Sequence, residues 1–141
     1  MNEKTIAKAG RIIEGKAGQG MDGYCVLALI DLDGHPTAST LSVAKANGIK
    51  WITFGTGLEG NKANRINKDN RASVCFSSAG YNITLVGTIE ILTDAKSKKE
   101  NWYDGLEYHF SGTDDPNFCV LRFKTSRYNL YVGEDEVSGN I

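Results

Sequence analysis

The chain has 141 residues, of which 40% are hydrophobic and 23% are charged, the composition of an ordinary globular domain. Its 16 basic and 17 acidic side chains give a formal net charge of -1, which argues against a protein that coats nucleic acid. No apolar run is long enough to cross a bilayer, and residues 1–16 lack the apolar stretch of a signal peptide. The sequence therefore predicts a single domain over residues 1–141 that acts in the cytoplasm, with neither nucleic acid nor membrane as partner.

The first half of the chain predicts one helix followed by three strands. Residues 5–18 place isoleucines and alanines on one side of a helix, and several glycines end this helix. The strands are expected over 24–32, 37–45 and 49–56. Between them, Asp33-Gly34 and Asn47-Gly48 are signals for tight hairpin turns. We therefore expect three sequential antiparallel strands, each paired with the next.

The second half predicts two more helices and four more strands. A short helix is expected over about residues 60–68, and Asp94 can cap a third helix over 95–110. The strands are expected over 71–78, 81–93, 118–125 and 127–133. Gly87 indicates a bulge or a close backbone approach, and a turn near Ser126 separates the last two strands. The polar tail 134–141 is expected to fray.

These elements predict a mainly β fold of the α+β class. About six to seven antiparallel strands with short flanking helices suggest a small closed or split barrel, since closure removes exposed strand edges. The three cysteines, Cys25, Cys75 and Cys119, lie among apolar neighbours and are expected to be buried thiols. His35 and His109 share no ligand spacing, so no metal site is predicted and both are assigned structural or surface roles.

A run of basic side chains follows the third predicted strand. The stretch "GLEGNKANRINKDNRASVCF" begins at residue 57 and carries lysine or arginine at positions 62, 65, 68 and 71. A helix that starts near Gly60 would direct free N–H groups and a positive dipole end at whatever precedes it. Lys62 in its first turn and Thr56 just before it would suit a phosphate monoester, whereas the charge of Glu59 opposes one.

The same run is also typical of an ordinary solvated helix. Arg65 and Asp69 are spaced i, i+4 and could pair, with Ala63 and Ile66 facing the core. The stretch has no P-loop or G-x-G-x-x-G spacing. Both interpretations therefore stay open on the pattern alone.

The second predicted strand favours the phosphate interpretation. Its run "STLS" begins at Ser39 and carries three hydroxyls in four residues, and a buried hydroxyl needs a hydrogen-bond partner. If this strand lies beside the third, Ser39 or Thr40 could approach Thr56 and Lys62. Hydroxyls, an ammonium and a helix N-terminus together would make a phosphate cradle.

Several motifs occur in one order along the chain. They are the Asp33-Gly34 hairpin, the T-x(5)-K from Thr56 to Lys62, the N-x-x-N-R-x-S-V from Asn67, the glycine-containing strand from Leu85 to Glu90, and the closing run "DDPNFCVLRFKTSRYNLYV". In order and spacing, residues 20–133 resemble the pyridoxamine 5′-phosphate oxidase-like FMN-binding split barrels. Among these, the chain is most similar to the small bacterial general stress proteins.

The resemblance implies a split barrel that forms a homodimer with FMN at the interface between two barrels. It assigns the phosphate and flavin edge to Ser39, Thr40 and Leu41, the phosphate oxygens to Thr56 and Lys62, and the flavin ring to Asn82, which stands where a glutamine is often found. Two positions depart from the family pattern. Ser39 and Asn61 stand where many relatives carry basic residues, so the phosphate would depend on Lys62, hydroxyls and backbone N–H groups, with Arg65 or Arg71 as candidates to compensate.

The implied function is that of an FMN-dependent oxidoreductase, a reductase or oxidase of a small substrate, with NAD(P)H as a candidate electron donor. One alternative is a stress-related carrier or sensor that binds flavin or haem without turnover, and another is an interaction protein whose cofactor site has decayed. No catalytic acid or base stands out, and the basic substrate signature of a true pyridoxamine 5′-phosphate oxidase is not recognised. The aromatic residues that could wall a planar ring are Trp51, Trp102, Tyr108 and Tyr131, although such residues more often lie in a core.

Overall fold

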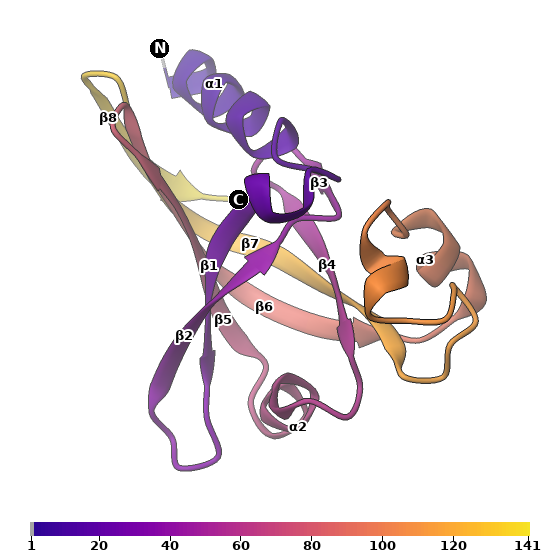
Figure 1. Ribbon diagram of the computed structural model, residues 1–141. Coiled ribbons are helices and arrows are strands. Elements are labelled where there is room, and N and C mark those ends of the chain that lie inside the picture. Colours follow the sequence, from indigo (N-terminus) through magenta and orange to yellow (C-terminus); the bar gives the residue numbers. More distant parts are fainter. Residues whose placement is uncertain (1) are drawn as a thin grey trace.

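The computed structural model describes residues 2–141 as one curled antiparallel sheet with short helices around it (Figure 1). The helices are α1 (Asn2–Glu14), α2 (Asn61–Lys68) and α3 (Ala95–Glu100), with 3-10 turns η1 (Gly20–Asp22) and η2 (Leu106–Tyr108). The strands are β1 (Tyr24–Ile30), β2 (Pro36–Ser42), β3 (Lys45–Asn47), β4 (Trp51–Gly57), β5 (Arg71–Ser78), β6 (Tyr81–Leu92), β7 (Phe118–Val132) and β8 (Asp135–Asn140). The predicted mainly β split barrel is confirmed. None of the helices in the described part of the chain has the length and apolar character of a membrane-crossing helix.

The barrel is joined at one corner and split beyond it. The strand order is β2-β1-β5-β6-β7-β4-β3, so β2 and β3 form opposite edges of the sheet although only Val43 and Ala44 separate them along the chain. At this corner the Val43 N–H donates to the Gly23 carbonyl, and the Ala44 N–H donates to the Thr53 carbonyl. Away from the corner, β2 and β4 run apart and leave the barrel open between them (Figure 1).

This corner corrects part of the predicted meander. The hairpin of β1 and β2 forms as expected, with Ala28 opposite Ala38. The second predicted strand does not continue beside the third, however, because it breaks at Val43 and only its last piece, β3, pairs with β4. The neighbourhood of β2 and β4 is therefore a gap and not a hydrogen-bonded ladder.

The long antiparallel pair of β6 and β7 carries the bulge that Gly87 predicted. The register shifts between Val86 and Gly87, where Thr125 pairs with Gly87 and Arg127 pairs with Val86. Ser126 is thus the extra residue of a bulge within one continuous strand, and the predicted turn at Ser126 was wrong. A Cβ atom on Gly87 would lie only 1.9 Å from the Lys124 carbonyl oxygen, which explains why this position has no side chain.

Two other predictions at the end of the chain were also wrong. The tail is not frayed, because β8 pairs with β7 and Val137 is buried opposite Leu130. The third helix is much shorter than expected, although its predicted cap is confirmed: the Ser97 N–H donates to the Asp94 carboxylate at 3.0 Å. The helix stops at Glu100, and Gly105 then adopts a φ of 113°, which a helix does not allow.

The interior of the barrel is filled by the inward-facing side chains of the long strands. Large residues such as Phe54, Phe76 and Phe123 are fully buried, as the alternating burial along β1, β5 and β6 requires. Helix α1 covers one end of the barrel with Ala9 and Ile13. This core gives the split edges a rigid frame.

The cysteines differ in a way that can be measured. Cys25 and Cys119 are buried as predicted. Burial raises the pKa of Cys25 to about 12, and nearby Cys75 adds a smaller contribution. Burial also raises the pKa of Cys119, to about 11. Cys75 is only half-buried, and its thiol donates to the Asn82 side-chain oxygen at 3.2 Å. Because the thiolate is the reactive form, we expect iodoacetamide at pH 8 to leave Cys25 and Cys119 of the native protein unmodified. Mass spectrometry of tryptic peptides reads this out, with denatured protein modified at all three sites as the control; equal labelling of Cys25 in native protein would contradict the assigned core.

Candidate functional site

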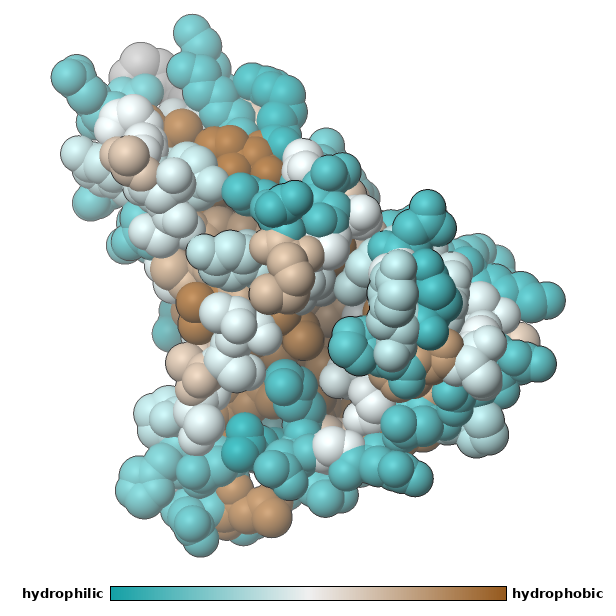
Figure 2. Space-filling model, viewed as in Figure 1, coloured by the Kyte–Doolittle hydropathy of each residue, from teal (hydrophilic) through white to brown (hydrophobic). Residues whose placement is uncertain are grey.

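A cleft of about 340 Å³ lies in the split of the barrel. Its walls come from the end of β2, the end of β4 and the segment 95–117, which we call the lobe and which is orange at the side of the sheet in Figure 1. Figure 2 shows the lobe set off from the rest of the surface by a hollow with hydrophobic residues at its base. The lining residues are Met21, Tyr24, Thr40, Leu41, Ser42, Gly55, Thr56, Gly57, Tyr103, Leu106, His109 and Phe110. A volume of this size falls in the range of small-molecule sites.

Three of the residues assigned from the sequence meet in this cleft. Thr40 and Leu41 contribute from β2, and Thr56 contributes from β4 across the split. Ser39 precedes them but lies outside the lining; it is exposed, and alternation along the strand places it on the opposite face of β2 from Thr40. The cleft therefore gathers hydroxyl groups from two strands that do not pair with each other.

Asn61 and Lys62 lie just beyond one end of the cleft, in the first turn of α2. They follow Gly57, the last lining residue of β4, after a short turn, but neither lines the cleft itself. The residue before the helix is Gly60, which offers no side chain to accept from the first N–H groups. Lys62 is half-buried, and the exposed Glu59 has its backbone N–H bound to the Asn117 side chain at 3.0 Å. The helix thus begins without a side-chain cap at the end of the cleft.

Asn82 is not part of the cleft of its own chain. It pairs with Tyr131 on β7, whereas Thr56 pairs with Cys119, and these two partners are twelve residues apart on that strand. At about 3.3 Å per residue, the two sites are separated by about 40 Å of strand. Asn82 could reach such a cleft only from another copy of the chain.

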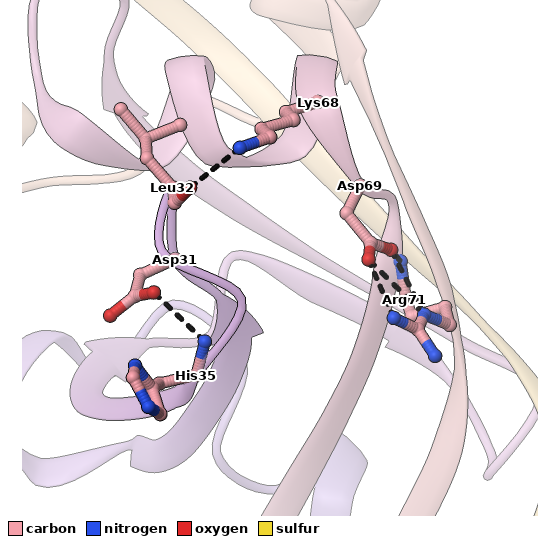
Figure 3. A network of polar contacts seen from close by, with 6 residues as sticks. All are labelled: Asp31, Leu32, His35, Lys68, Asp69 and Arg71. Atoms are coloured by element: carbon pink, nitrogen blue, oxygen red, sulfur yellow. Dashed lines mark hydrogen bonds and ion pairs between the residues drawn. The ribbon is translucent and has the colours of Figure 1, made fainter.

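Helix α2 also connects the two sides of the split. At its far end, Lys68 donates to the Leu32 carbonyl in the hairpin between β1 and β2, and the hairpin is itself held by the Asp31 carboxylate, which accepts from the His35 N–H (Figure 3). The predicted pair of Arg65 with Asp69 does not form. Arg71 binds Asp69 instead, at 2.7 Å, so Arg71 is engaged away from the cleft.

The ion pair of Asp69 and Arg71 predicts an unusual titration. Hydrogen bonds from the Arg71 side chain and backbone lower the pKa of Asp69 from 3.8 to about 2. Because the folded-state pKa is depressed, the pair stabilises the fold fully above pH 3.8, and this contribution is lost as the pH falls toward 2. NMR titration of the carboxyl carbons should show Arg71→Gln raising the pKa of Asp69 while leaving Asp94, which is bound to Ser97, unchanged. A native Asp69 that titrates near 3.8 would contradict the pair.

The sequence did not indicate the lobe side of the cleft. Tyr103, Leu106, His109 and Phe110 all belong to the segment that was assigned to one amphipathic helix. His109, expected to be structural, is exposed at the edge of the cleft. None of the four aromatic residues proposed as ring contacts lines the cleft; Trp102 instead packs edge-on against Phe118, with ring centroids 5.2 Å apart.

The lobe is held firmly against β4 and β7. The buried Thr53 hydroxyl of β4 donates to the Asn101 side chain of the lobe at 2.6 Å, and within the lobe the Lys98 ammonium donates to the Asp115 carbonyl at 2.9 Å. Gly55 allows the close packing, since a Cβ there would lie 3.0 Å from the Phe118 ring. The wall of the cleft is therefore a packed surface, fixed from below by its own small hydrophobic cluster.

The lining is mostly apolar, with a few hydroxyl groups, and carries no lysine, arginine, aspartate or glutamate side chain. Burial raises the pKa of Tyr103, and contact with the Ser42 side chain opposes this only in part, so the phenol stays protonated. Within residues 2–141, no three histidine, cysteine, aspartate or glutamate side chains gather as metal ligands. The cleft itself is thus suited to an uncharged, ring-like group, with the positive charge of Lys62 beyond the end at α2.

Residues 20–131 match the family model described as pyridoxamine 5′-phosphate oxidase. The chain belongs to this family. Its pyridoxamine 5′-phosphate oxidase fold is shared by a protein related to general stress protein 26 from Clostridium acetobutylicum, with 26% identity, a TM-score of 0.84, and coverage of 100% of this chain and 97% of that one. No curated protein matched the chain.

Two more distant structures of the same fold differ in the cofactor that they are named for. A pyridoxamine 5′-phosphate oxidase-related, FMN-binding protein from Nostoc punctiforme has 16% identity and a TM-score of 0.60, with coverage of 99% of this chain and 94% of that one. A haem-binding protein from Mycobacterium smegmatis has 18% identity and a TM-score of 0.71, with coverage of 96% of this chain and 57% of that one. Proteins that share this fold are thus named for either cofactor.

Proposed function

We propose that the protein is an FMN-binding oxidoreductase that acts on a small substrate. The observation that carries this proposal is the position of the cleft: threonines of β2 and β4 line it from the two sides of the split, and the uncapped start of α2 with Lys62 follows the last lining residue of β4. The membership in the pyridoxamine 5′-phosphate oxidase family and the FMN-binding relative support the choice of flavin.

The residues of the cleft and of the first turn of α2 fit the two parts of FMN, a phosphate and a flat ring. Thr56, Lys62 and the first N–H groups of α2 would hold the phosphate, and Thr40 and Leu41 would border the ring. When bound, FMN would supply the transfer of two electrons, while the protein binds it, orients it and excludes water. Since Ser39 and Asn61 are not basic and Arg71 is paired with Asp69, Lys62 would be the main positive charge on the phosphate.

A homodimer would complete this site. The outer face of the sheet carries a row of small side chains, Ala38, Ala28, Ser73 and Val86, which lie opposite one another on four adjacent strands. Such a row of small, largely apolar side chains suits close packing against a second copy of the chain. Asn82 shares this outer face with Val86, because both occupy alternate positions on β6, so packing there would bring Asn82 from one copy toward the cleft of the other.

The three cysteines are unpaired, which suits a reducing compartment such as the cytoplasm.

A direct test of the flavin proposal is to denature the purified protein and determine the mass and absorbance of any small molecule released. FMN with an absorbance band near that of free flavin supports the proposal; bleaching of the bound form by NADH or NADPH and recovery with an acceptor would separate an enzyme from a carrier. A different released molecule would overturn the flavin assignment.

A second candidate is a haem-binding carrier or sensor, and one observation favours it. His109 lies at the edge of the cleft, where its imidazole would be available to bind a haem iron. The absorbance spectrum distinguishes the two candidates. A Soret band that shifts in His109→Ala would favour haem, whereas a flavin spectrum that is unaffected by that substitution would favour FMN.

A further inference from the structure

We propose that Tyr103 is the ring-binding residue of the cleft, and that it determines flavin affinity independently of the phosphate anchor at Lys62. This inference rests on the proposed function, since it assigns the opposite end of the same site. Tyr103 belongs to the lobe, and none of the residues that the family resemblance assigned to the site lies in the lobe.

The two ends of the cleft differ in chemistry. One end is formed by Thr56 and Gly57 and leads into the first turn of α2, where Lys62 provides the positive charge. The other end is formed by the last residue of β2, Ser42, and by Tyr103 from the lobe. A ligand with an anionic tail and a neutral ring therefore has one favourable orientation, with its ring at the Tyr103 end.

Tyr103 is held in place for such a role. Its phenol contacts the Ser42 side chain, so the lobe reaches across to β2 and bounds the cleft there. The residue before it, Trp102, packs on Phe118, and Asn101 is fixed by the buried hydrogen bond from Thr53. A rigid backbone on both sides fixes where the phenol can point, which limits the entropy lost when a ligand binds.

The phenol also has the right chemistry for the ring of a flavin. It remains a hydrogen-bond donor, and a flavin ring carries carbonyl and nitrogen acceptors along its edge. Its aromatic face adds apolar contact with a flat ligand. A second phenol, Tyr24, lies opposite Ser42 at the same end, but Tyr24 is 54% exposed, whereas Tyr103 is half-buried. The lining has no lysine, arginine, aspartate or glutamate side chain, so Tyr103 is the better-fixed neutral donor that can recognise a ring at that end.

Paired titrations with FMN and riboflavin test the assignment, because the two ligands share the ring and differ in the phosphate. Tyr103→Phe should weaken binding of both ligands by the same factor, about three- to tenfold, as expected for one lost hydrogen bond. The matched control is Tyr108→Phe, a change of the same atom on the same lobe at a side chain that is 85% exposed and outside the cleft. Circular dichroism and thermal unfolding of each variant check that the lobe remains folded.

The outcomes separate this inference from the proposed function. Equal weakening of FMN and riboflavin by Tyr103→Phe, with no change in Tyr108→Phe, supports the ring assignment. Unchanged affinity for both ligands in Tyr103→Phe, while Lys62→Ala still weakens FMN, would overturn the ring assignment and leave the proposed function intact. Weakening of FMN alone would also overturn it, since the contact would then be to the phosphate. If neither flavin binds the unmodified protein, the proposed function fails and this inference fails with it.

Discussion

Lys62→Ala is expected to weaken FMN binding by about ten- to a hundredfold and to leave riboflavin binding unchanged. A hydrogen bond to a charged group contributes about 1.5–3 kcal/mol, and each 1.4 kcal/mol is a factor of ten in affinity. The loss should be near the upper end, because no charged side chain in the lining replaces the ammonium and Arg71 is bound to Asp69. Quenching of flavin fluorescence at constant ionic strength measures both dissociation constants.

The matched control for this change is Lys96→Ala. It removes the same charge from a side chain that is 84% exposed and that pairs only weakly with Glu100, at 4.0 Å. Its FMN affinity should therefore equal that of the unmodified protein. If Lys62→Ala binds FMN as well as the control does, or if it weakens riboflavin to the same extent as FMN, the phosphate does not lie at the start of α2.

Gly87→Ala is expected to be the most destabilising single methyl addition in the sheet, with a loss of about 3 kcal/mol or more of unfolding free energy. The new Cβ would lie 1.9 Å from the Lys124 carbonyl oxygen, so the strands must separate at the Ser126 bulge and break hydrogen bonds between β6 and β7. Urea unfolding followed by circular dichroism gives the change in free energy.

Gly80→Ala is the matched control for the bulge. Gly80 lies in the turn between β5 and β6, and a Cβ there would meet no atom within 4 Å. Its unfolding free energy should change by less than about 1 kcal/mol in either direction. Equal stability of the two variants would mean that β6 and β7 do not approach each other closely at Gly87.

Local sequence patterns were sufficient to predict most of the strands. The alternation of apolar and polar residues, the hairpin dipeptides and one internal glycine each reflect a requirement of the backbone or of packing. The strand 71–78 and the bulge at Gly87 are examples. The continuity of β7 through Ser126 and the pairing of β8 could not be predicted in this way, since both depend on β6 and β7 lying side by side. The corner at Val43 was missed for the same reason: the chain passes from β2, beside β1, to β3, beside β4, only because the sheet curls.

The candidate site was predictable only on its strand and helix side. Thr40 and Thr56 meet because β2 and β4 converge at the corner, and Lys62 follows from the helix that begins after β4. Tyr103 and His109 were hidden in a segment whose apolar spacing resembled one long helix, and Gly105 interrupts it. Asn82 lies far along β6 from the cleft, so its assigned role depends on the proposed second subunit and not on this chain alone.

Equilibrium dialysis of the ligand-free protein against FMN tests the central claim most directly, with sedimentation equilibrium on the same samples. We predict saturable binding of one FMN per chain, with two chains in each complex. Protein that binds no FMN at concentrations far above those of a typical flavoprotein site, or that remains monomeric while it binds, would contradict the proposal that the split between β2 and β4 is a shared flavin site.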